Sequence, residues 1–284
     1  MRFVTLQRES YTEPGVWRND EIIGLRDAGF TGILQIISGG ADALDRVERW
    51  IYSPPGSERL DAAEATLLSP VPRPPKLICI GLNYRDHAAE GQNPIPEVPT
   101  IFSKFTTAVT GHRCPIILPK SSTKPDYEAE LAVVVGKGGR HIAEADWRRH
   151  VFGYTITNDV SARDFQSVTS QWMIGKTFDT FAPIGPAIVT ADEIQDPHNL
   201  KISLTLNGEV MQDSSTSNMI FGVPRLISYL SSVFTLEPGD IIATGTPAGV
   251  GFARRPPRWL KPGDECRVQI ERLGELMNPV VAET

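Results

Sequence analysis

The chain has 284 residues, 40% of them hydrophobic and 22% charged, a composition typical of ordinary globular proteins. Its net charge of −6, with acidic and basic residues interspersed, argues against nucleic-acid binding, which needs basic patches. No apolar run approaches the ~18 residues of a membrane span and no secretory signal pattern opens the chain, so we expect a cytoplasmic protein that binds no membrane.

Residues 1–69 predict a small N-terminal α/β domain. Its expected elements are a strand, a turn with a second strand, and an amphipathic helix, at residues 2–7, 14–25 and 41–51. Four prolines between positions 70 and 75 then impose an extended backbone. We place the domain boundary there, so residues 70–284 form a larger domain that holds the candidate site residues.

A buried strand over residues 77–82 is followed by a short predicted helix over residues 84–90. The helix places His87 and Glu90 three residues apart on one face. A carboxylate in that position can orient the imidazole and raise its basicity, as a general base requires. The residues alone also allow a solvated histidine and glutamate.

The stretch from residue 126 to 166 predicts two strands that end in carboxylates. Side chains alternate along a strand, so Glu128 and Glu130 point the same way, roughly 7 Å apart, in the strand over residues 127–135. Residues 151–158 form a second strand pattern, which ends at Asp159. Three carboxylates without cysteine suit a hard divalent cation. Alternatively, the glutamates face water and the aspartate only ends a strand.

A helical turn follows these strands, with Ser161 and Asp164 at N-cap and N3 spacing. Lys176 then stands in an apolar neighbourhood, where its stem covers apolar surface or its charge points into a cleft. The later expected elements are a hairpin turning at Asn207-Gly208, a helix, a strand leading into a glycine-rich loop, and two closing strands, at residues 200–216, 221–236, 237–252 and 260–281.

Four motifs in this order resemble the fumarylacetoacetate hydrolase family over roughly residues 75–281: YEAELAVVVG, NDVSARDFQ, GKTFDTFAPIGP and TGTPAGVG. The resemblance implies an α+β, mostly β fold with a rolled mixed β-sheet, usually as a homodimer. It also implies a metal-dependent enzyme that acts on small 2-oxo or 2,4-dioxo acids. By this resemblance Glu128, Glu130 and Asp159 hold Mg²⁺ or Mn²⁺.

The resemblance also implies catalytic roles. The pattern NYxxHxxE matches the family's histidine–glutamate pair on a mobile lid, which makes His87 the base and Glu90 its partner. Lys176 matches a lysine that points at the substrate beside the metal, where its charge stabilises an enolate or oxyanion.

Three further residues are implied to bind substrate. Arg163 matches the position that holds the substrate carboxylate, Gln166 one that holds a carbonyl or water, and Thr246 a substrate-contacting threonine. Phe105 departs from the proline usual after Lys104, which affects the local loop. For Lys104 itself we expect an exposed position, with a cleft-facing one as the alternative.

These observations predict a metal-dependent hydrolase that cleaves a carbon–carbon bond in a 2,4-dioxo acid during small-molecule catabolism. His87 would activate water and Lys176 would stabilise the leaving enolate. The same site could instead decarboxylate oxaloacetate, tautomerise an oxo acid, or isomerise an unsaturated 2-oxo or 2-hydroxy acid. A further alternative is a protein that binds an oxo acid without turnover.

Overall fold

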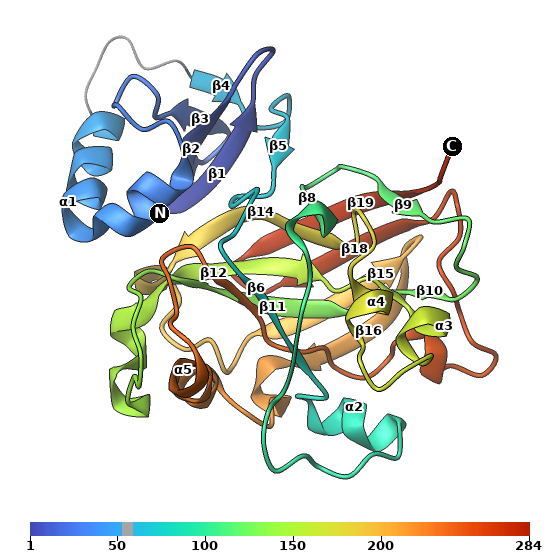
Figure 1. The fold of residues 1–284 in the computed structure, drawn as a ribbon. Coiled ribbons are helices and arrows are strands. Elements are labelled where there is room, and N and C mark those ends of the chain that lie inside the picture. The colour runs from blue at the N-terminus through green and yellow to red at the C-terminus, as the bar shows by residue number, and fades with distance from the viewer. Residues whose placement is uncertain (53–58) are drawn as a thin grey trace.

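A computed structural model describes residues 1–52 and 59–284, and strands dominate it (Figure 1). Within these residues no helix is both long and apolar enough to cross a bilayer. The α-helices are α1 (Ile33–Tyr52), α2 (Arg85–Glu90), α3 (Arg163–Gln166), α4 (Met173–Lys176) and α5 (Val223–Val233). The prediction of an α+β, mostly β fold is confirmed.

The largest sheet has 12 strands and both parallel and antiparallel pairs, so it is mixed, as predicted. Its path runs through β4 (Arg59–Asp61), β3 (Glu21–Gly24), β2 (Thr12–Arg18), β1 (Arg2–Gln7), β14 (Ala182–Thr190), β12 (Val151–Asn158), β11 (Ala129–Val135), β17 (Ile241–Ala243), β6 (Leu77–Gly81) and β7 (Thr100–Ser103). Off this path, β5 (Leu67–Leu68) pairs with β1 and β8 (Val109–Thr110) with β14.

A second sheet of five strands packs against the first (Figure 1). Its strands, in spatial order, are β16 (Glu209–Ser215), β15 (Lys201–Leu206), β18 (Glu265–Ile270), β19 (Gly274–Ala282) and β9 (Ile116–Leu118). Leu131 and Ile156 of the large sheet share one buried cluster with Leu204 and Val268 of the second. Removal of this apolar surface from water holds the two sheets together.

The N-terminal strands continue the large sheet, because β1 pairs with β14. Phe3 and Ile33 from this part are buried in one cluster with Val134 and Ile188. The boundary at residue 70 stays a prediction. The expected single strand over residues 14–25 is instead a hairpin of β2 and β3.

Two other local predictions need correction. Helix α1 begins at Ile33 instead of residue 41 and bends at Gly40, where φ is 56°. Ser161 does not cap a helix, because it lies in the short strand β13 (Ser161–Ala162), which pairs with β10 (Pro125–Asp126). The helix α3 starts two residues later, and Asp164 accepts hydrogen bonds from Ser122 and Thr123 instead.

His112 links the segment before β9 to β19. The N–H of Met277 donates to His112 Nδ1 over 3.2 Å. Burial, helped by the neighbouring Arg113, lowers the pKa of His112 from its ordinary value of 6.5 to about 4. Protonation would remove the lone pair that accepts this bond, so the folded protein disfavours the charged imidazole.

We therefore expect His112 to make the folded state less stable as the pH falls. Between pH 6.5 and about 4 the unfolded chain takes up the proton more readily than the folded chain, so the free energy of unfolding drops. Replacing His112→Asn keeps an acceptor but removes the titration. Urea unfolding at a series of pH values should show a shallower acid loss in the variant. Identical pH slopes would contradict the assignment.

Candidate active site

Three carboxylates meet where the central strand pair β11–β12 ends. We call Glu128, Glu130 and Asp159 the acidic trio. Ala129 pairs with Asn158, and the N–H of Asp159 donates to the Glu128 carbonyl over 2.8 Å. This register brings one carboxylate oxygen from each member within 4.8 Å of the others, and all three residues are buried. The structure thus brings together the three residues that the sequence singles out.

Two buried lysines contact the acidic trio. Lys176 Nζ lies 2.7 Å from Glu128 Oε2 and 2.8 Å from Asp159 Oδ2. Lys104 Nζ lies 2.5 Å from Asp159 Oδ1 and donates to the Val160 carbonyl over 2.9 Å. The expectation of an exposed Lys104 is wrong, because this residue, just after β7, turns its charge inward onto Asp159.

Among the described residues, Glu130 is the member of the acidic trio that forms no ion pair. Within residues 1–52 and 59–284 no lysine or arginine forms an ion pair with it. Burial, Asp159 and Glu128 raise the pKa of Glu130 well above its ordinary value. For Glu128, burial also opposes ionisation, but Lys176 and Arg163 outweigh it and lower the pKa. Three clustered oxygen ligands, one without a partner cation, fit a hard divalent ion.

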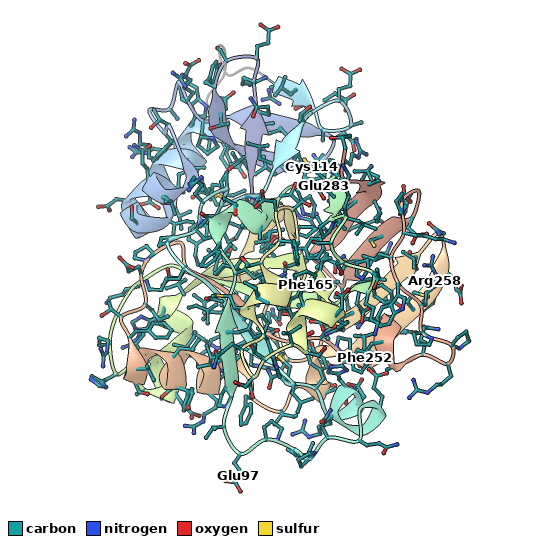
Figure 2. The ribbon with its side chains drawn as sticks, turned by 45° about the vertical axis from the view of Figure 1, so that its right-hand side comes forward. Glu97, Cys114, Phe165, Phe252, Arg258 and Glu283 are labelled. Carbon is teal, nitrogen blue, oxygen red and sulfur yellow. The ribbon has the colours of Figure 1, made fainter. Side chains whose placement is uncertain are left out.

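The predicted histidine–glutamate pair lies on α2. His87 Nδ1 is 2.7 Å from Glu90 Oε1, and the Gly249 N–H donates to Glu90 Oε2 over 2.9 Å. Gly249 has a φ of 103° and packs against β16, where a Cβ would lie 2.1 Å from the Met211 carbonyl oxygen, so this position of the loop requires glycine. Phe252 meets the His87 ring edge-on, with centroids 6.3 Å apart, and lies beside the teal helix α2 in Figure 2. Glu90 therefore orients the imidazole and ties α2 to the glycine-rich loop.

Arg163 connects Glu128 of the acidic trio to Asp126 and Gln166. Its Nε donates to Asp126 Oδ2 over 2.8 Å, its Nη1 donates to Gln166 Oε1 over 2.9 Å, and its Nη2 lies 2.6 Å from Glu128 Oε1. Burial works against the charge, but Glu128 and Asp126 outweigh burial and raise the pKa of Arg163. All three nitrogens thus contact the protein, although the sequence prediction gave this residue to the substrate.

Two buried residues of the site were missed from the sequence. Asp126 accepts a hydrogen bond from the Gly251 N–H over 2.7 Å in addition to its pair with Arg163. Gln212 accepts from the Ala129 N–H over 2.9 Å and donates to Thr246 Oγ1 over 2.8 Å. Both fix the glycine-rich loop against β10 and β11. No spacing in the sequence marks either residue, because its partners are more than thirty positions away.

One cavity of about 490 Å³ collects most of the predicted site residues, and its size is that of a small-ligand pocket. Those that line it are His87, Glu128, Glu130, Arg163, Gln166, Lys176 and Thr246. The other two, Glu90 and Asp159, contact the lining residues His87 and Lys176. Four aromatic side chains line a further part of it: Phe102, Trp172, Phe252 and Trp259.

The arrangement resembles known proteins in sequence and in structure. Over 224 residues, 78% of this chain and 71% of the relative, it is 53% identical to the mitochondrial oxaloacetate tautomerase FAHD2A of Bos taurus. A fumarylacetoacetate hydrolase from Exiguobacterium antarcticum superposes with a TM-score of 0.86 at 34% identity, covering all of both chains. The maleylpyruvate hydrolase of Sphingobium sp. SYK-6, solved with a manganese(II) ion and pyruvate, superposes with a TM-score of 0.85 at 31% identity over the same coverage.

A family model supports the same relationship. The model described as fumarylacetoacetate (FAA) hydrolase C-terminal matches residues 76–281, which include all nine predicted site residues. The sequence motifs, the mixed-sheet fold and the relatives therefore agree. This chain belongs to the fumarylacetoacetate hydrolase family.

Proposed function

We propose that this protein is a divalent-metal-dependent enzyme that interconverts the keto and enol forms of oxaloacetate. The observation that carries the proposal is one cavity in which the acidic trio, Lys176 and the His87–Glu90 pair lie together. The 53% identity to an oxaloacetate tautomerase supports this reaction ahead of the hydrolysis predicted from the sequence.

The acidic trio would hold Mg²⁺ or Mn²⁺. Hard oxygen ligands suit both ions, and a structural neighbour at 31% identity was solved with manganese(II). When bound, the ion supplies Lewis acidity that polarises the 2-oxo group. Lys104 and Lys176 would keep Asp159 and Glu128 oriented toward it through the contacts described above.

His87 would move the proton. Because Glu90 accepts the hydrogen bond of Nδ1, Nε2 is the ring nitrogen left to accept a proton. In tautomerisation one proton leaves C3 of the oxo acid and one is added to the C2 oxygen, so no carbon–carbon bond breaks and no oxidant is needed. His87 would take the C3 proton as a base, and the resulting imidazolium, or a water molecule, would return a proton to the C2 oxygen.

Lys176 would stabilise the enolate oxygen. Burial works against its charge, but Asp159 and Glu128 outweigh burial and raise the pKa of Lys176, so an ammonium group faces the cavity at neutral pH. A fixed positive charge in a partly buried site stabilises developing negative charge more strongly than water does.

We assign Gln166 and Thr246, which line the cavity, to contact the substrate. Arg163 also lines it, but its three nitrogens contact Asp126, Gln166 and Glu128, so we propose that its main part is to position these side chains. Arginine's planar fork suits such simultaneous contacts.

Hydrolysis of a 2,4-dioxo acid is the second candidate, and the maleylpyruvate hydrolase neighbour favours it. It would use the same enolate stabilisation, with His87 activating water instead of removing a carbon-bound proton. Decarboxylation of oxaloacetate would also pass through an enolate. The three reactions differ in products, so a product-resolved assay separates them.

We also propose a homodimer, with the free edge of the large sheet as one contact surface. Among the described residues strand β7 ends that sheet, and Ile101 within it and Phe105 just after it are exposed hydrophobic residues. The cytoplasmic location stays a prediction, against relatives whose names place them in mitochondria.

The first test follows the enol absorbance of oxaloacetate and pyruvate formation with metal-stripped protein and after addition of Mg²⁺ or Mn²⁺. We expect the metal-loaded protein to accelerate enol loss well beyond the metal alone, and EDTA to abolish the effect. Cleavage of an acylpyruvate without any acceleration of the tautomerisation would instead establish the hydrolase. Release of CO₂ as the only enzymatic reaction would establish the decarboxylase.

The second test replaces the proposed base. His87→Ala should lower kcat by about 10²–10⁴-fold, the usual contribution of a positioned base, while Mn²⁺ binding measured by titration stays unchanged. His150→Ala is the matched control, because His150 hydrogen-bonds Lys137 outside the cavity lining. Full turnover in His87→Ala would remove this residue from the mechanism.

A further inference from the structure

The deep lining of the cavity, its floor, carries both carboxylates and cations, whereas its exposed lining, the rim, carries a positive charge alone. The acidic lining residues are Glu128 and Glu130, both buried at the floor. Exposed at the rim are Lys124 and Ser167, with half-buried Gln166 next to them. The rim thus presents hydrogen-bond donors and a positive charge, without a lining carboxylate among the described residues.

Lys124 is the lining cation that the protein leaves uncompensated. Arg163 and Lys176 each contact two carboxylates of the protein. Across residues 1–52 and 59–284, the Lys124 ammonium group forms neither an ion pair nor a hydrogen bond. Its charge is therefore available to an anion that enters the cavity.

The backbone holds Lys124 next to the residues that complete the rim. The Arg163 N–H donates to the Lys124 carbonyl over 2.9 Å, and the following Pro125 pairs with Ala162. Gln166 is oriented too, because its Oε1 accepts from Arg163 Nη1 over 2.9 Å. The amide nitrogen of Gln166 is a hydrogen-bond donor and takes no part in the bond to Arg163. The backbone of Lys124 and the side chain of Gln166 are therefore both held by Arg163, and both residues line the cavity.

We propose that Lys124, together with the amide nitrogen of Gln166, binds the distal carboxylate of a dicarboxylic 2-oxo acid. The oxo-acid end lies at the acidic trio and the second carboxylate at the rim. This inference rests on the proposed function for the placement of the oxo group. It identifies Lys124 as the residue that makes the site selective for dianionic over monoanionic 2-oxo acids.

Removing the Lys124 charge should weaken the binding of a dianionic substrate and leave the rate of the chemical step unchanged. Lys124 is exposed, so loss of its charge should raise KM for the dianion by about 1.5- to 5-fold, the range for a solvated ion pair. The value of kcat should stay the same because the reacting atoms lie at the floor. A monoanionic acid has no group to meet Lys124, so its KM should not change.

The kinetic test measures deuterium exchange at C3 of oxaloacetate and of 2-oxobutanoate by NMR. The reaction runs in D₂O with Mn²⁺-loaded protein, and the sample is diluted for acquisition. The variants are Lys124→Met, which removes the charge, and Lys124→Arg, which keeps it. Lys120→Met is the matched control, since Lys120 is exposed nearby and does not line the cavity. We expect a higher KM for oxaloacetate in Lys124→Met alone, with 2-oxobutanoate unaffected.

A binding test decides the inference even without turnover. L-Malate and 2-hydroxybutanoate differ only in a carboxylate or a methyl group at the distal end, and neither carries an oxo group to enolise. Calorimetric titration of the Mn²⁺-loaded wild type should favour malate, and Lys124→Met should reduce that preference by the same factor as the KM change. An unaltered preference, or an equal weakening of both acids, would overturn the assignment of Lys124. Absence of tautomerisation in the wild type with an intact malate preference would instead overturn only the proposed function.

Discussion

The constraint on which this site depends is the burial of more carboxylates than the protein compensates. Asp126 and the acidic trio contribute four carboxylates, and three cations, Lys104, Lys176 and Arg163, contact them. Buried like charges repel strongly in a low-dielectric interior unless a proton or a cation intervenes. With a divalent ion beside Glu130, the four carboxylates, the three side-chain cations and the ion would together carry a net charge of +1. This charge suits an anionic substrate.

The fold meets this constraint by making the cluster rigid. The central strands β11 and β12 are buried along their whole lengths, and their register fixes the acidic trio. The glycine-rich loop is held by Asp126, Gln212 and Glu90, and the hydrogen bond to Glu90 connects the loop to helix α2. Figure 2 shows Glu97, in the loop after α2, pointing away from the molecule. Helix α2 contacts the site through His87, which lines the cavity and pairs with Glu90.

Features set by local geometry could be predicted from the sequence. Strand alternation gives the common side of Glu128 and Glu130, and helical spacing gives the His87–Glu90 pair. The inward position of Lys104 could not be predicted, because its partner Asp159 lies on a different strand connection. The failure of the predicted helix cap at Ser161 could not be foreseen either, because Ser161 pairs with Asp126 in the β10–β13 strand pair. Pairings between distant segments determine these residues, and no local pattern records them.

The choice between reactions also lies beyond local motifs. A hydrolase and a tautomerase can share an acidic trio, a base and an enolate-stabilising lysine, and differ in whether water reaches a carbonyl. That difference depends on the shape of the remaining cavity wall, which includes Phe102, Trp172 and Trp259. Because the sequence motifs are common to both reactions, they do not discriminate between them, and the 53% identity to an oxaloacetate tautomerase is what favours tautomerisation.

The central claim is that the acidic trio binds one divalent cation. Its most direct test is anomalous diffraction at the manganese edge from crystals grown with Mn²⁺, compared with crystals of Glu130→Gln. The account predicts a single strong peak per chain between Glu128, Glu130 and Asp159, weakened or absent in the variant. A wild-type map without density among those three carboxylates would contradict it.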